Sequence, residues 1–600
     1  MPSITLLVAC LGAAYFATFF VRLGRNYLIA RKTRLPIVIV PWDQNHFLWM
    51  AASVPLMPHL RKWLPSAIIN RLALTTYGFE FHERDRIYRC YTGGERSYMH
   101  VGMGKLEMNT SDPEIVYEIL RRPKDFQVHE LTSLFMERFG HNVLTSDGER
   151  WARHRKIVAS VINERVSKAV FSESIQQADG LVREVMGGKE EARTGRMFDM
   201  MKQITINVLS GATMGQSVPF SESDQKGKKV REGYRMNYIE SVKVLVDSVA
   251  GPIILPQWFL RNYPSFLPGH AFLRKLSYAI DEFPIHTNQL LEEERARTAS
   301  SKEGETRGNV MSQLLAASEA SEKSAGLTSD EMMGNLFIFT IAGFDTTANT
   351  LSYSLALLAR HQNWQDWVRE EIDRILPPSA TVEELDYSEI YPQATRIMAF
   401  MFETLRLFPP LIHISKQTRT AQTIRTSKGE YWLPADMTIY SNTIGLHSDP
   451  NYWRNLNLQP GEIAAEDDEW RFRPTRWFNP EGSAQVLYQP PKGVFVPWSA
   501  GPRVCPGQKV SCCMKAGAEE HELTWSLQMA QVEYTSVILT LLRRCRLEPA
   551  PLDGESIEQT HRRLEARMRD SISILTLQMA GVYDVKDEAG GLPLRLVARR

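Results

Sequence analysis

The sequence predicts a mainly α-helical protein with small β sheets and one N-terminal transmembrane helix. The first observation is a mostly apolar helical run at residues 328–360, which at about 1.5 Å per residue is long enough to cross a whole domain. The second is an uncharged apolar run at residues 4–21. The third is a mixture of short apolar runs and turns at residues 85–125, typical of a small strand region that leads into a helix near residues 113–122.

Composition limits the classes of function. The chain has 600 residues, which is enough for several domains, but a single large helical enzyme with a membrane anchor also fits. The hydrophobic fraction of 43% is ample for a packed core, and a formal net charge of +1 gives no indication of nucleic-acid binding. The 6 cysteines form no CxxC pair. This favours a reducing compartment over a disulfide framework or a structural zinc site.

The N-terminal run at residues 4–21 is at the short end for a membrane span. Arg22 and Arg25 follow it, whereas only the amino terminus is charged before it. The positive-inside rule therefore places the catalytic body in the cytosol. A cleaved signal peptide is the alternative, but it normally has its charge before the run and a small-residue cleavage site after it. We expect a membrane anchor at residues 1–34 and one catalytic domain at residues 35–600.

Two features of the middle of the chain are open to more than one interpretation. Residues 250–273 are apolar and aromatic but contain four prolines, so they cannot form one helix, and core packing is the default explanation. Asn109 begins a glycosylation sequon, which a cytosolic body would leave unused.

The long helical run contains an unusual polar stretch. Thr328 and Glu331 form a capping box that predicts where the helix begins. A glycine and two threonines in mid-helix are poor choices on helix propensity, and the carboxylate of Asp345 is costly on a core helix unless it has partners. A locally opened helix turn would explain both. Thr346 could then bond a distal dioxygen or water while Asp345 supplies protons. The alternative is a packing notch with a satisfied aspartate.

The chain also offers an acid and a base three residues apart. Glu403 and Arg406 lie on one face of a predicted helix. Pro409 ends this helix soon afterwards. ExxR alone is a weak signal. Lys416 and His413 follow the proline pair as further candidates for a pocket or an anion site, whereas His447 is expected to be structural.

A cysteine in a Gly/Pro turn is the last motif. Trp498, Gly501, Arg503 and Cys505 stand in the stretch that ends at Gly507. A thiolate that ligates iron needs partial compensation of its charge, which the backbone N–H groups of a tight turn or a following helix can provide. Arg503 can reach an acidic group beside the metal, such as a haem propionate. A buried structural cysteine is the alternative for this stretch alone.

Together these motifs resemble the cytochrome P-450 family. The cysteine stretch matches the haem signature Phe-x-x-Gly-x-Arg-x-Cys-x-Gly at every fixed position except the first, where Trp498 stands. Ala342-Gly343-Phe344-Asp345-Thr346 matches the oxygen-activation motif Ala-Gly-x-Asp-Thr. Trp151 and Arg155 match the family's Trp-x-x-x-Arg helix. The family more often has Glu where Thr475 stands, which is a departure.

The resemblance covers about residues 35–585 and implies a P-450 fold. It implies that Cys505 is the axial ligand of the iron in haem b. Trp151 and Arg155 bond a haem propionate, and Arg503, Lys416, Trp498 and Gly501 complete the haem site. Asp345 and Thr346 manage proton delivery. Glu403, Arg406 and Arg476 form a structural salt-bridged triad. In anchored members, the region that corresponds to residues 250–273 dips into the lipid and lines substrate access.

One segment departs from the family pattern. After Lys509 the family normally runs straight into an apolar helix, but a family-like segment resumes here only at Met529. The codons that residues 510–528 allow include a splice donor, a branch point and an acceptor, and the insertion keeps the reading frame. We therefore predict a retained intron at residues 510–528, with a genuine loop as the alternative. Sequencing the mature transcript decides between them. If translated, the segment splits the helix whose N-terminus faces the thiolate.

The resemblance implies a monooxygenase that inserts one atom of O2 into a lipophilic small molecule, by hydroxylation or epoxidation. Secondary-metabolite biosynthesis is a candidate role. The chain has no Gly-rich dinucleotide fingerprint in a βαβ context. Electrons must then come from a separate NADPH–cytochrome reductase, with cytochrome b5 as a second candidate donor, at the endoplasmic reticulum membrane. Two rivals remain: a P-450-fold isomerase or dehydratase that does not use O2, and a non-catalytic haem binder.

Overall fold

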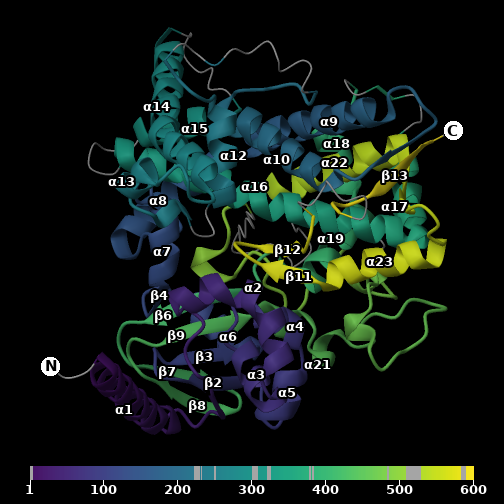
Figure 1. Ribbon diagram of the computed structural model, residues 1–600. Helices are drawn as coiled ribbons and strands as arrows, with labels where there is room; N and C mark the ends of the chain where they lie inside the picture. Colours follow the sequence, from purple (N-terminus) through teal and green to yellow (C-terminus); the bar gives the residue numbers. More distant parts are fainter. Residues whose placement is uncertain are drawn as a thin grey trace, which may run out of the picture.

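A computed structural model (Figure 1) describes the protein at residues 4–221, 230, 233–248, 252–300, 308–319, 326–376, 380–381, 384–482, 486–507, 529–582 and 590–599. These residues form a large helical region and a smaller region around a mixed sheet (Figure 1). The expectation of a mainly helical protein with small sheets is confirmed. The predicted insertion at residues 510–528 lies outside the described residues.

The α-helices cover most of the described chain. In chain order they are α1 Ile4–Arg31, α2 Phe47–Trp63, α3 Ser66–Ala73, α4 Phe79–Glu83, α5 Arg86–Tyr91, α6 Pro113–Arg121, α7 Glu130–Met136, α8 Gly148–Val161, α9 Glu164–Met186, α10 Met197–Met214, α12 Tyr238–Ser248, α13 Gln257–Asn262, α14 His270–Ser300, α15 Val310–Glu319, α16 Ser329–Arg360, α17 Gln362–Ile375, α18 Tyr387–Ile390, α19 Thr395–Leu407, α20 Thr443–His447, α21 Pro450–Trp453, α22 Met529–Arg544 and α23 Ile557–Arg569. Short 3-10 helices are η1 Pro252–Ile254, η2 Tyr391–Gln393, η3 Asp468–Trp470, η4 Pro474–Trp477 and η5 Gly501–Arg503.

The strands form four sheets in the described part of the chain. They are β1 Ile37–Ile39, β2 Ser97–Val101, β3 Glu107–Thr110, β4 Phe126–Val128, β5 Glu191–Thr194, β6 His413–Thr418, β7 Gln422–Thr426, β8 Gly429–Leu433, β9 Thr438–Asn442, β10 Cys545–Pro549, β11 Ser571–Ser573, β12 Leu577–Met579 and β13 Leu594–Ala598. The largest sheet has the order β1-β2-β3-β9-β6-β4, and a smaller one has the order β10-β13-β5. The hairpins β11-β12 and β7-β8 complete the set.

Helix α16 forms the axis of the helical region. It packs against α10, α19 and α22, and α22 also packs against α9. Most of its side chains are buried, as its apolar sequence predicts. The Thr328 hydroxyl accepts from the Glu331 backbone N–H while the Glu331 carboxylate accepts from the Thr328 N–H, so the predicted capping box is confirmed.

Several local predictions agree with the structure. Helix α6 begins after Asp112, whose carboxylate caps it, and strands β2 and β3 precede it as expected. The proline-interrupted segment at residues 250–273 is broken into η1, α13 and the start of α14 in its described part. The start of the predicted strand region 85–125 differs from the prediction, because residues 86–91 form the short helix α5.

The N-terminal run is helical, within α1. No helix among the residues that could be searched is both long enough and apolar enough to cross a bilayer.

Candidate active site

An internal cavity of about 690 Å³ lies between α16, the six-stranded sheet and the turn that carries Cys505. Cys505 lines one part of its wall and Thr346 of α16 lines another. Apolar side chains make up much of the remaining wall, among them Phe135, Met136, Leu209, Ile338, Phe339, Leu411 and Leu575. The structure therefore brings the cysteine stretch and the polar stretch of the long helix to one cavity.

The turn before Cys505 is closed by backbone hydrogen bonds. The Cys505 N–H donates to the Trp498 carbonyl at 2.9 Å, and the Val504 N–H donates to the Gly501 carbonyl at 3.1 Å. Gly501 has a φ of +69°, and a Cβ there would lie 2.6 Å from the Leu120 carbonyl oxygen at the end of α6. Glycine is thus required both for the turn and for its packing on α6.

Three basic side chains line the same cavity near Cys505: Arg155, Lys416 and Arg503. Within the described residues, neither Arg155 nor Lys416 has a hydrogen bond or an ion pair. Burial, followed by the nearby Arg503 charge, lowers the pKa of Lys416 to about 8. Burial also lowers the pKa of Arg155. Lys416, which is buried, and Arg155, which is half-buried, thus line the cavity without an ion-pair partner among the described residues.

The Arg503 guanidinium contacts both the Ser146–Asp147 segment and the Trp151 ring. Its guanidinium donates to the Ser146 carbonyl at 2.7 Å and pairs with Asp147 at 2.5 Å, and it lies 4.8 Å from the centre of the Trp151 ring. Its Nε is buried without a hydrogen-bond partner. The resemblance implied that Trp151, Arg155 and Arg503 act together, and the structure places all three on the cavity wall.

These groups fit a haem. A thiolate is a haem-iron ligand, and the flanking cations suit carboxylate groups. Three cations and the Asp147 carboxylate leave two positive charges, which two propionates would balance. The buried, unpaired Nε of Arg503 and the unpaired Lys416 are the donors that such carboxylates would satisfy.

On the α16 side, Thr346 lines the cavity but Asp345 does not. The Thr346 hydroxyl donates to the Ala342 carbonyl at 2.7 Å. Helix α16 continues without interruption through these residues, so the expected locally opened turn is wrong. A hydroxyl that bonds the carbonyl one turn earlier is compatible with a regular helix, which accounts for the difference.

The Asp345 carboxyl is buried and accepts a hydrogen bond from a residue outside α16. The Thr576 hydroxyl donates to Asp345 Oδ2 at 2.5 Å, and Asn349 Nδ2 donates to the Thr576 hydroxyl at 3.0 Å. Burial raises the pKa of Asp345. Thr576 belongs to the turn between β11 and β12, whose residues 573–575 line the cavity. The wall of the cavity and the acid are therefore joined through one turn.

The predicted triad lies away from the cavity, in a fully buried network. Glu403 Oε1 lies 2.8 Å from Arg406 Nη2 and 2.9 Å from Arg476 Nε. Burial alone would raise the pKa of Glu403, but the charges of Arg406 and Arg476 lower it to about 2. The three residues that sequence predicted are thus brought together.

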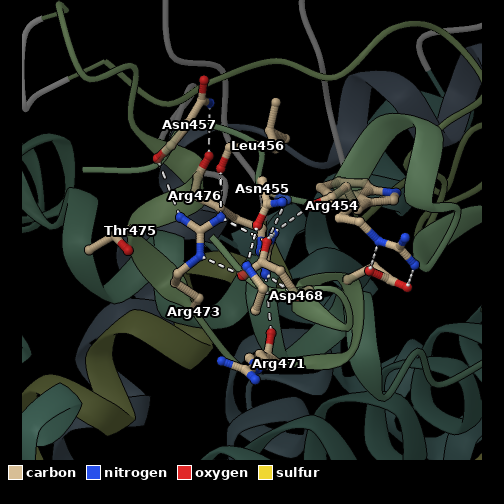
Figure 2. A network of polar contacts seen from close by, with 12 residues as sticks. Arg454, Asn455, Leu456, Asn457, Asp468, Arg471, Arg473, Thr475 and Arg476 are labelled. Atoms are coloured by element: carbon tan, nitrogen blue, oxygen red, sulfur yellow. Dashed lines mark hydrogen bonds and ion pairs between the residues drawn. The ribbon is translucent and has the colours of Figure 1, made fainter. Parts of the chain in front are cut away.

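The network extends beyond the triad (Figure 2). Asp468 pairs with Arg476 at 3.0 Å and with Arg473 at 3.0 Å. Glu462 pairs with Arg473 at 2.8 Å and accepts the Thr475 hydroxyl at 2.5 Å. Thr475 stands where the family usually has Glu, and in this chain Glu462 brings a carboxylate to the Thr475 hydroxyl and to Arg473. No spacing pattern along the chain predicted that Asp468, Arg473 and Glu462 belong to this network.

Glu533 of α22 is the acidic residue of the cavity wall that sequence analysis missed. Its side chain is 2% exposed, and Oε1 has no hydrogen-bond partner. Burial raises its pKa to about 8, and a hydrogen bond with Thr205 of α10 opposes this only in part. At neutral pH the buried carboxyl therefore holds a proton beside the cavity. Its position in an apolar helix gave no sign of this, because the cavity is formed by distant segments.

The raised pKa of Glu533 gives a prediction for stability. The unfolded carboxyl loses its proton near pH 4.5 and the folded one near pH 8, so the folded state binds more protons between these values. The free energy of unfolding should therefore fall as pH rises through this window, by at most about 1.4 kcal/mol per pH unit from this group. Glu533→Gln should remove that slope, measured by urea unfolding from about pH 5 to about pH 8.

The matched control is Glu558→Gln on the exposed face of α23, which should leave the slope unchanged. An identical pH dependence in the wild-type protein and Glu533→Gln would contradict the assignment of a protonated Glu533.

The fold and the site define the class of protein. A mainly helical chain holds a cysteine and a cluster of buried cations at one cavity with a long central helix, which is a haem-thiolate arrangement. Comparison with known proteins agrees: a family model described as Cytochrome P450 matches residues 70–515. The chain belongs to the cytochrome P450 family, and it is a monooxygenase of that family.

Three relatives illustrate the similarity. The phomenoic acid biosynthesis cluster cytochrome P450 monooxygenase of Leptosphaeria maculans is 36% identical over 592 residues, which cover 95% of this chain and 95% of the relative. Cytochrome P450 monooxygenase 124 of Postia placenta is 29% identical over 473 residues, covering 77% and 79% of the two chains. Cytochrome P450 monooxygenase ORF6 of Penicillium roqueforti is 24% identical over 555 residues, covering 86% and 87%.

Proposed function

We propose that the protein inserts one oxygen atom from O2 into a lipophilic small molecule, by hydroxylation or epoxidation, in secondary metabolism. The observation that carries this proposal is the single cavity that brings Cys505 and Thr346 together inside an otherwise largely apolar wall. The similarity to a monooxygenase from a phomenoic acid biosynthesis cluster supports the metabolic role.

Each site residue has a proposed part. Cys505 would ligate the iron of haem b, and Arg155, Lys416 and Arg503 would hold its propionates. Haem b would supply the iron at which O2 is activated, with a thiolate ligand that favours cleavage of the O–O bond. Thr346 would hold a proton at its hydroxyl on the cavity wall, and Asp345, whose pKa is raised by burial, would replenish it. The apolar wall would exclude water from the bound substrate.

The proposed partners are a separate NADPH–cytochrome reductase, or cytochrome b5 as a second donor, at the endoplasmic reticulum membrane. The uncharged run within α1 and the exposed side chains of Phe16, Phe20 and Val21 support membrane attachment by the N-terminus. Trp258 and Phe266, in the segment 250–273, are 67% and 84% exposed, which supports the hypothesis that this segment dips into lipid. A fluorescence probe of membrane depth at Trp258 that reported bulk water would contradict it.

Labelled dioxygen tests the reaction. The chain is co-expressed with the reductase and with its neighbouring genes under isotopically labelled O2, and the metabolites are analysed by mass spectrometry. A monooxygenase should give a product that carries one labelled oxygen atom and that requires NADPH. A rearranged product without the label would instead support the isomerase or dehydratase. A normal carbon monoxide difference spectrum without any product-forming activity would support a non-catalytic haem binder.

A further inference from the structure

The wall of the cavity carries a second polar group that the proposed chemistry does not use. Tyr77, between α3 and α4, and His413, at the start of β6, both line the cavity. Their ring centres are 5.0 Å apart, with the rings edge to face. The same cavity is also lined by apolar residues such as Leu131, Leu411 and Ile574.

A buried carboxylate stands behind His413. Glu80 Oε1 lies 3.1 Å from His413 Nδ1, and the two residues are 1% and 6% exposed. His413 is the only basic side chain that pairs with Glu80 among the described residues. The Nδ1 contact with Glu80 leaves Nε2 on the other side of the ring, where it is an acceptor in the neutral ring and a donor in the protonated ring.

The two groups on the cavity side have no partner in the protein. Within the described residues, neither the Tyr77 hydroxyl nor His413 Nε2 makes a hydrogen bond. Neither atom is among the fully buried unsatisfied atoms, whereas Glu80 Oε2 is. The Tyr77 hydroxyl and His413 Nε2 are therefore accessible polar groups on a largely apolar wall, which is the pattern of a ligand-orienting group.

The chain holds this pair in place. Gly78, with a φ of +86°, follows Tyr77, and a Cβ there would lie 2.7 Å from Ser573 Cβ and 3.0 Å from Ile412 Cδ1. Tyr77 is thus fixed between the β11 hairpin and the residue before β6. On its other side, the His413 ring centre lies 4.6 Å from that of Tyr440. Both polar groups are thus positioned by packing against neighbouring elements, and such preorganisation lowers the entropy cost of binding.

We propose that Tyr77 and His413, with Glu80 against His413, bind a carbonyl or carboxyl group at one end of an otherwise apolar substrate. The Tyr77 hydroxyl donates to an oxygen of this group, and His413 Nε2 is the second polar contact. The pair orients the substrate, so that the carbon to be oxidised is set by its distance from this oxygen along the chain. This inference rests on the proposed haem site, and it names the substrate class of that site. Such a site disfavours an analogue that lacks the oxygen, because its polar groups are then left unpaired.

Iron-ligating probes test the proposal without knowledge of the natural substrate. The probes are 1-alkylimidazoles of graded chain length that end in a methyl group, a methyl ester or a carboxylate. The imidazole ligates the haem iron of the full-length holoenzyme and shifts its Soret band, which gives the Kd. At the chain length that spans the cavity, the ester or the carboxylate should bind roughly tenfold or more tightly than the methyl probe. Comparison of the Kd values of the ester and carboxylate probes shows whether the site prefers a neutral carbonyl or an anion.

Three variants locate the effect. Tyr77→Phe should reduce the preference for the oxygen-bearing tails severalfold, and the double variant Glu80→Gln with His413→Gln should reduce it without leaving Glu80 buried and unpaired. Tyr98→Phe is the matched control, because the Tyr98 hydroxyl is also buried without a partner but lies outside the cavity. That control should retain the full preference.

The proposal is overturned if all three tails bind equally at every chain length, or if the preference survives in both Tyr77→Phe and the double variant. Absence of any Soret shift, with every probe, would instead refute the haem site itself and with it this proposal.

Discussion

Replacing Cys505 with serine is expected to abolish the thiolate signature in the carbon monoxide difference spectrum and to reduce turnover to background. Cys505 lines the cavity at the end of a turn closed by backbone hydrogen bonds, so the variant changes the ligand atom with little change in shape. A serine hydroxyl does not ionise at neutral pH as a metal-bound thiol does. The measurement is the spectrum of the reduced protein together with the reductase-dependent turnover assay.

Cys90→Ser is the matched control for this prediction. Cys90 is an exposed cysteine on α5 and does not line the cavity, so its replacement should leave both the spectrum and the turnover unchanged. A Cys505→Ser variant with an unaltered spectrum would show that the cysteine is not the iron ligand.

Replacing Glu403 with glutamine is expected to lower the free energy of unfolding by about 3–5 kcal/mol. Glu403 accepts from Arg406, Arg476, the Arg473 backbone and the Trp477 indole, all within the buried network. Glutamine cannot compensate the guanidinium charges, so Arg406 stays buried without its counter-ion and Arg476 keeps only Asp468. Urea unfolding of the holoenzyme measures the loss, and a fall in haem content at a given temperature should accompany it.

Arg471→Gln is the control in the same segment (Figure 2). The Arg471 side chain is 58% exposed and pairs with Asp467, which is 64% exposed. A surface pair of this kind contributes at most about 1 kcal/mol, and the backbone carbonyl of Arg471 still accepts from Arg406 and Arg476 in the variant. Equal destabilisation by the two substitutions would contradict a special role of the buried network.

The same network has a pH dependence of opposite sign to that of Glu533. The pKa values of Glu403 and Asp468 are lowered to about 2, because the arginine charges outweigh the effect of burial. Their contribution to stability is thus present above the ordinary carboxylate range and is lost as pH falls toward 2. We therefore expect the network to lose its contribution in acid, whereas the contribution of Glu533 falls as pH rises from about 4.5 to about 8.

Sequence patterns predicted the features that depend on neighbours along the chain. The capping box of Thr328 and Glu331 marked the start of α16, and the spacing of Glu403 and Arg406 marked one pair of the triad. The family motifs then connected Arg476 with that pair, and Cys505 with Asp345 and Thr346, which no local spacing could have joined. Membership of the family is confirmed by the comparisons.

Sequence patterns did not reveal contacts between distant segments. Glu80 and His413 are 333 residues apart, and Asp345 and Thr576 are 231 apart, so no periodicity connects them. Glu533 lies in a mostly apolar helix, and the sequence around it does not indicate that it lines a cavity. The expected opening of α16 was wrong because propensity penalises mid-helix threonines but does not account for a hydroxyl that bonds back to the Ala342 carbonyl.

The segment that joins β11 to β12 makes two kinds of contact. Residues 573–575 line the cavity, and Thr576 donates a hydrogen bond to the Asp345 carboxyl. If a bound molecule displaces residues 573–575, the displacement would also act on the hydrogen bond between Thr576 and Asp345, because one short turn makes both contacts. Filling of the cavity and the hydrogen bonding of the acid would then be coupled.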